Sequence, residues 1–137
     1  ASGAKILQHP GFRDDGLNVY VPEKVLADPK KAAALRIFAE YWGRAQRWIN
    51  DNPEELAQGY FVENRGLPLP DARFMAEYSR NLTVPTTWES AIAYQQAAID
   101  TLAPETNHVP LQAENLFDRR FEAVAGHGFS QVQGATP

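Results

Sequence analysis

The sequence predicts a mostly helical chain of about five helices, with two or three short strands near its start. Three observations lead to this fold class. Helix-start signals built from Asp, Thr, Pro and Glu recur along the chain. Between them, apolar residues repeat every three or four positions, which is the period of an amphipathic helix. Apolar and polar residues alternate most clearly in residues 17–21, which predicts the best strand.

The longest predicted helix covers residues 28–52. Asp28 suits its N-cap because a carboxylate accepts bonds from first-turn amides, and Pro29 suits the next position, where no N–H is needed. Pro53 disfavours helical backbone at Asn52, so we expect the helix to end there and a new one to begin. The period predicts a broad buried face, formed by Leu35, Phe38, Tyr41, Trp42, Ala45, Trp48 and Ile49.

The remaining elements follow from breakers and periodicity. Residues 4–7 predict a brief strand, residues 14–16 a turn, and residues 22–26 a single helical turn. A second helix follows Pro53 and stops at Gly66, and a shorter third one starts at Pro70. Thr86 and Glu89 fit a capping box that opens a fourth helix. Residues 104–110 predict a loop, residues 114–125 a last helix, and residues 126–137 a loosely held tail.

Composition limits the classes of function. The 137 residues are one domain or a piece of one, and they are long enough to bury a core. A net charge of −4 argues against a nucleic-acid partner, which needs clustered basic residues. The chain has no cysteine, which excludes disulfides, zinc-thiolate sites and thiol nucleophiles. No apolar run is long enough to predict a transmembrane span.

No motif predicts catalysis or a metal centre. His9, His108 and His127 lie far apart without a helical partner, and we interpret them as solvated rather than as metal ligands. The serines lack a nucleophile-elbow context. The pair Glu54 and Glu55 could act as acid and base, but its place at a helix start favours complementarity with the helix dipole. We predict no cofactor.

Two polar features remain as candidate binding residues. Asn18 and Tyr20 share one face of the predicted strand just after a turn, where side chains can meet a ligand, and the alternative favoured for Tyr20 is burial in the core. The second feature is a small basic cluster at the start of the long helix, which is either a solvated helix edge or a contact with an acidic neighbour. It consists of Lys24, Lys30 and Lys31.

Several short motifs occur in a characteristic order along residues 3–125. The most specific are RWINDNPEE at residues 47–55 and the connector Gly66-Leu67-Pro68. The others are GAKIL at 3–7, NVYV at 18–21, VPTT at 84–87, YQQ at 94–96 and NLFD at 115–118. In this order they resemble the C-terminal part of periplasmic substrate-binding proteins of ABC importers, of the type that binds aliphatic sulfonates, taurine and nitrate.

The resemblance implies an α/β fold of two lobes that close on a small anionic solute. It assigns residues 1–21 to a crossing strand and hinge, residues 22–125 to the helical C-terminal part of a lobe, and residues 126–137 to a flexible tail. The implied partners are the solute, an ABC permease, and the remainder of the binding protein or a second copy. The implied location is periplasmic or lipid-anchored at the cell surface. Of the two candidate ligand residues, Asn18 and Tyr20, the resemblance supports Asn18, which would supplement the uncharged donors and helix N-termini that hold the oxyanion in such proteins.

Two other classes of function stay open. One is an enzyme on the same fold, such as a desulfinase or a pyrimidine-precursor synthase, which needs a catalytic Cys or His in the cleft. The other is a stand-alone helical interaction module. Turnover would distinguish the first from a binding protein, and a self-contained helical bundle would distinguish the second.

Overall fold

The computed structural model describes residues 19–106, 109 and 111–131. Within this part of the chain every regular element is a helix, so the predicted α/β class with two or three strands is wrong for it. Val19, Tyr20 and Val21 have neither helical nor strand structure, and the rest of the predicted strands lies outside the described residues. A strand is stable only when a neighbour pairs with its backbone, and none of the described segments does so for residues 19–21.

The first helices confirm the predicted start and end signals. A single turn, α1 (Glu23–Leu26), precedes the long helix α2 (Pro29–Asp51). The Asp28 carboxylate accepts hydrogen bonds from the backbone N–H groups of Lys30 and Lys31 at 3.0 and 3.3 Å. Helix α2 ends before Pro53, which takes the first position of α3 (Pro53–Glu55). The chain therefore turns where the proline forbids α2 to continue.

A helical hairpin closes against the C-terminal end of α2. Helix α3 continues as η1 (Leu56–Asn64), a wide π-helix. The chain reverses at Gly66, whose φ of 70° costs glycine little free energy because it has no Cβ. Helix α4 (Leu69–Ser79) then packs back on η1. The buried residues form what we call the hairpin core: Leu56, Ala57, Ala72 and Ala76, with Trp48, Ile49, Phe61, Val62 and Leu67 packed against them.

An extended segment returns along α2 from the hairpin. It begins at Asn81, whose positive φ of 71° is tolerated by asparagine better than by most residues. The Asn50 side chain donates to the Leu82 carbonyl at 2.7 Å and accepts from the Leu82 N–H at 3.0 Å. One side-chain amide thus binds this backbone much as a neighbouring strand would.

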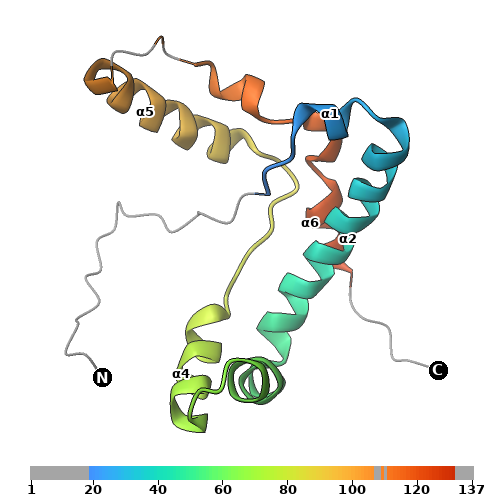
Figure 1. Cartoon of the computed structure of the whole chain (residues 1–137), viewed down its shortest axis with the longest axis vertical. Coiled ribbons are helices and arrows are strands. Elements are labelled where there is room, and N and C mark those ends of the chain that lie inside the picture. The colour runs from blue at the N-terminus through green and yellow to red at the C-terminus, as the bar shows by residue number, and fades with distance from the viewer. Residues whose placement is uncertain (1–18, 107–108, 110, 132–137) are drawn as a thin grey trace.

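Helix α5 (Glu89–Thr106) follows and projects away from α2 (Figure 1). The predicted capping box at Thr86 is wrong, because the helix starts later and the Trp88 carbonyl accepts the Ile92 N–H. Pro104 lies inside α5 rather than in the predicted loop. None of the described helices combines the length and apolar character that a membrane crossing requires.

The predicted last helix at residues 114–125 is also wrong. Two short 3₁₀ turns occupy half of it, η2 (Ala113–Leu116) and η3 (Arg119–Phe121), and they are followed by α6 (Val124–Ser130). The first turn is held to α5 by Gln96, whose side chain accepts from the Ala113 N–H at 2.7 Å and donates to the Leu111 carbonyl at 3.2 Å. Residues 126–130, expected in the tail, are therefore helical.

Helix α6 lies beside α2 because glycines allow the two backbones to touch (Figure 1). A Cβ added to Gly43 would overlap the Ala125 carbonyl oxygen, and one added to Gly128 would overlap the Glu40 carbonyl oxygen. Gly126 packs in the same way against the Pro85 carbonyl oxygen, at 2.6 Å from a Cβ built there. The face of α2 that is most closely covered therefore packs through its backbone. It is not the aromatic face that the sequence predicts to be buried.

Candidate functional site

Of the two predicted ligand residues, the structure describes one. Asn18 lies outside the described residues. Tyr20 is 86% exposed, so its alternative interpretation as a core residue is wrong. Ligand contact at Tyr20 stays a prediction.

The carboxylate pair at the start of α3 has a structural role. The Glu54 carboxylate accepts hydrogen bonds from the Arg73 guanidinium at 2.6 and 3.0 Å, which joins α3 to α4. These bonds lower the pKa of Glu54 below its usual range. A general acid needs a raised pKa, so Glu54 is unsuited to that task. Both glutamates lie in the first turn of α3, in agreement with the interpretation as dipole complementarity.

No group of three or more His, Asp or Glu side chains suited to a metal ion occurs among the residues that the structure describes. His127 is exposed on α6, and His9 and His108 fall outside the described ranges. The serine hydroxyls of Ser79 and Ser130 donate to the carbonyls of Met75 and Gly126 within their own helices. These hydroxyls are not aligned with a base.

A small apolar groove runs along α5. It holds about 180 Å³, below the roughly 300 Å³ at which small-molecule sites usually begin. Its lining comes from one face of α5 and the segment after it: Gln95, Ala98, Ile99, Leu102, Ala103, Thr106, Val109 and Leu111. Such a lining offers Gln95 and Thr106 as polar groups and no charge, so it does not resemble an anion site.

The densest polar cluster in the described chain centres on Arg119. Its guanidinium donates to carboxylates from three segments: Glu89 at the start of α5 (3.1 Å), Glu114 in η2 (2.8 and 3.0 Å), and Glu122, which is in still closer contact. Glu122 also accepts the Trp88 N–H at 2.7 Å. The cluster therefore ties the start of α5 to the segment that leads into α6.

Arg119 sets one positive charge against the three carboxylates bonded to it. The hydrogen bonds from Arg119 lower the pKa of Glu114. The pKa of Glu89 is also lowered, first by its own backbone N–H, then by Thr87 and Arg119. The pKa of Arg119 is raised by the same carboxylates, Glu114 foremost. The cluster holds segments together, and its one guanidinium, already bonded to three carboxylates, is not available to an anionic substrate. In the sequence, the charged residues between 118 and 122 are the only sign of the Arg119 cluster.

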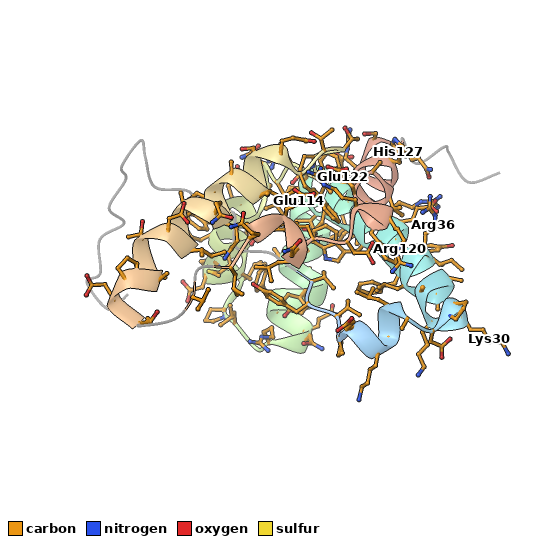
Figure 2. The ribbon with its side chains drawn as sticks, turned by 90° about the horizontal axis from the view of Figure 1, so that it is seen from above. Lys30, Arg36, Glu114, Arg120, Glu122 and His127 are labelled. Atoms are coloured by element: carbon orange, nitrogen blue, oxygen red, sulfur yellow. The ribbon has the colours of Figure 1, made fainter. Side chains whose placement is uncertain are left out.

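A different surface lies on α2, on the side that α6 does not cover. Arg36, Glu40, Gly43 and Arg47 face η3 and α6, as the Arg36 bond to the Arg120 carbonyl (3.1 Å) and the Gly43 contact demonstrate. The opposite side of the N-terminal half carries what we call the outer stripe: Lys30, Lys31, Ala34, Ile37, Phe38, Tyr41 and Ala45. In Figure 2, Arg36 and Arg120 lie together at this end of the molecule while Lys30 points outward.

Phe38, Tyr41 and Ala45 of the outer stripe belong to the face that was predicted to be buried, and all three are exposed. Ile37, Phe38 and Tyr41 are 59%, 51% and 62% exposed. By contrast, five of the seven buried hydrophobic residues in the described chain are alanines, and none of its larger side chains is completely buried. The described helices thus bury small residues and leave large ones in solvent, which is the reverse of a self-sufficient core.

Comparisons with known proteins identify no relative. Neither the protein-family models, nor the curated proteins, nor the solved structures gave a match to this chain.

Proposed function

We propose that this chain is the C-terminal portion of the solute-binding component of an ABC importer. The component binds a small anion, such as an alkanesulfonate, in a hinged two-lobe cleft and carries out no catalysis. One observation carries the proposal: the described helices leave Ile37, Phe38 and Tyr41 exposed while their own core is built mostly from alanine. Helices with this pattern are completed by further protein.

The motifs that carry the resemblance support the proposal by where they lie. The RWINDNPEE motif spans the junction of α2 and α3, where Asn52 N–H caps the Trp48 carbonyl at 2.9 Å and Pro53 opens the next helix. The Gly66-Leu67-Pro68 connector supplies the reversal between η1 and α4. Gln96 of the YQQ motif holds the segment after α5. Each of these three motifs has a local structural task, as expected of a scaffold rather than of an active site.

In this proposal the helices form a rigid support for one side of the cleft. Closure is a rotation of one lobe relative to the other, driven by the better contacts that the solute makes in the closed form. The oxyanion of the solute is bound by uncharged donors and helix N-termini that lie mostly outside this chain, with Asn18 and Tyr20 as contributors. The protein is periplasmic or lipid-anchored, and delivers its solute to an ABC permease.

Two measurements test the proposal. The first is the coding sequence adjoining the codon of Ala1, in which we expect a further lobe and a secretory leader. The second is calorimetric titration of the complete polypeptide with taurine, alkanesulfonates and nitrate. Micromolar or tighter binding with unchanged solute is the expected result. Chemical conversion of the solute would favour an enzyme, and a chain that is complete and compact by itself would favour a helical interaction module.

A further inference from the structure

We infer that the outer stripe of α2 docks an apolar protein surface edged with carboxylates, and that this occupant is not a second copy of the chain. The natural occupant is the rest of the solute-binding protein, and to that extent the inference rests on the proposed function. What is new is the identity of the docking surface, its orientation and the charge of its partner.

Continuity along α2 is the first argument. Ala34, Phe38, Tyr41 and Ala45 follow one another at spacings of three and four, so they occupy one side of the helix. The next position on that side is Trp48, which packs on the hairpin core. One apolar side of α2 is therefore covered by helices in its C-terminal half and bare in its N-terminal half. The bare half fits the same kind of cover, a packed protein surface.

Charge is the second argument. Lys30 and Lys31 stand at the N-terminal end of the outer stripe, where the positive end of the helix dipole adds to their field. Lys31 lies 3.6 Å from Asp28, while Lys30 has no ion pair among the described residues. The nearby carboxylate of Glu40 is already paired with Arg44. The stripe thus presents cations at one end and no free carboxylate, so its complement is acidic there.

The same charges argue against self-association. Two parallel copies of α2 would bring Lys30 and Lys31 against the same lysines, and two antiparallel copies would bring them near the Glu40–Arg44 pair, which has no free carboxylate to offer. The area is also small. Three side chains of roughly 150–250 Å², each about half exposed, supply roughly half of the ~800 Å² that a stable interface buries on each partner. The stripe is therefore one part of a larger contact with a different surface.

The test uses the 137-residue chain and two synthetic amphipathic peptides of about 20 residues. Their apolar faces are identical, but one is edged with Glu and the other with Lys. Binding is measured by fluorescence anisotropy of the labelled peptides at low salt. We expect the Glu-edged peptide to bind at least about tenfold more tightly than the Lys-edged one. Phe38→Glu should weaken that binding by about tenfold or more, and Lys30→Glu with Lys31→Glu should reverse the preference.

Tyr78→Glu provides the matched control. Tyr78 is 60% exposed, close to the 51% of Phe38 and the 62% of Tyr41, but it belongs to α4 and not to the stripe. It should leave peptide binding within about twofold. Circular dichroism verifies that each variant keeps its helices. Equal affinity for the two peptides, absence of binding, or an equal loss in Tyr78→Glu would overturn the inference.

Other occupants give separate outcomes. Sedimentation velocity showing a dimer that Phe38→Glu dissociates would assign the stripe to a second copy, against the inference. Association with phosphatidylglycerol vesicles that Phe38→Glu abolishes, without a difference between the peptides, would assign it to a membrane, also against it. The peptide result is independent of the titration with solutes, because it involves neither a solute nor the remainder of the binding protein.

Discussion

The two sides of α2 are packed in opposite ways. Toward α6, the helix presents Gly43 and the Glu40 carbonyl, and the two backbones touch. On the outer stripe it presents Phe38 and Tyr41, and both are more exposed than buried. Large apolar side chains mark a surface that gains most from being covered, whereas a glycine contact gains mainly from close backbone fit. The difference indicates that α6 completes one side of α2 within this chain, while none of the described elements covers the outer stripe.

A substitution at Gly43 tests the difference between the two sides of α2 most strongly. In Gly43→Ala the new methyl group overlaps the Ala125 carbonyl, which belongs to backbone and cannot swing away. We expect α6 to separate from α2 at a cost of about 3 kcal/mol. Urea unfolding measures the loss. The matched control is Gly59→Ala in η1, where nothing lies within 4 Å and the change should be neutral or stabilising. Equal effects of the two substitutions would contradict the packing described for α6.

The hairpin core offers the next largest effect. Leu56 is 9% exposed and is the largest of the buried residues in that core. Leu56→Ala removes its contacts with the alanines of α4 and should lower the free energy of unfolding by about 2 kcal/mol. The value comes from chemical denaturation with the slope held common to both proteins. A loss below roughly half of that would mean that the hairpin is loosely packed.

A smaller effect is expected at the start of α2. Asp28 caps two backbone N–H groups, and Asp28→Ala should cost about 1 kcal/mol. Asp28→Asn retains an acceptor oxygen and should recover most of the loss. Thermal unfolding of the three proteins at neutral pH provides the comparison. Identical midpoints for the aspartate and alanine forms would show that the cap does not contribute.

The pair of Glu54 and Arg73 predicts a weak dependence on pH. Its bonds lower the pKa of Glu54 in the folded chain below the ordinary 4.5, so the pair stabilises the fold above about pH 4.5. That stabilisation is lost as the pH falls through the lowered pKa. Wild type should therefore lose more stability than Arg73→Gln between pH 5 and pH 3, by a small margin that high salt removes. Parallel pH profiles of the two proteins would refute this contribution.

Much of the fold was predictable where a local signal decides the structure. Asp28 with Pro29, Pro53, and Gly66 each act within one turn of chain, and α2, α3 and the reversal before α4 follow from them. What failed depends on distant residues. Phe38 and Tyr41 satisfy a buried pattern, yet no described element covers them. Conversely, the sequence predicts a loosely held tail at Gly126 and Gly128, because it does not show that Gly126 packs against Pro85 and Gly128 against Glu40.

The candidate ligand residues were less accessible to prediction. Tyr20 was placed on a strand, and whether such a segment forms a strand depends on a partner far along the chain. In the Arg119 cluster, Glu114 and Glu122 lie within five residues of Arg119, but Glu89 is thirty residues away. Short-range spacing does not encode the contact with Glu89.

The smallest expected effect sharpens the comparison of the two sides of α2. Phe38→Ala removes an aromatic ring that is 51% exposed and should change the free energy of unfolding by no more than about 0.5 kcal/mol. A loss of several kcal/mol, like that of a core phenylalanine, would place Phe38 in a packed core of this chain.

Thiol reactivity is the most direct measurement of the central claim, because the chain has no cysteine of its own. In Phe38→Cys the single thiol should react with an aromatic disulfide reagent nearly as fast as in the denatured chain. In Ala57→Cys, at a position with no exposed surface, the thiol should react more slowly by about a hundredfold or more. Equal protection of the thiols at 38 and 57 would contradict the claim that the outer stripe is bare in this chain.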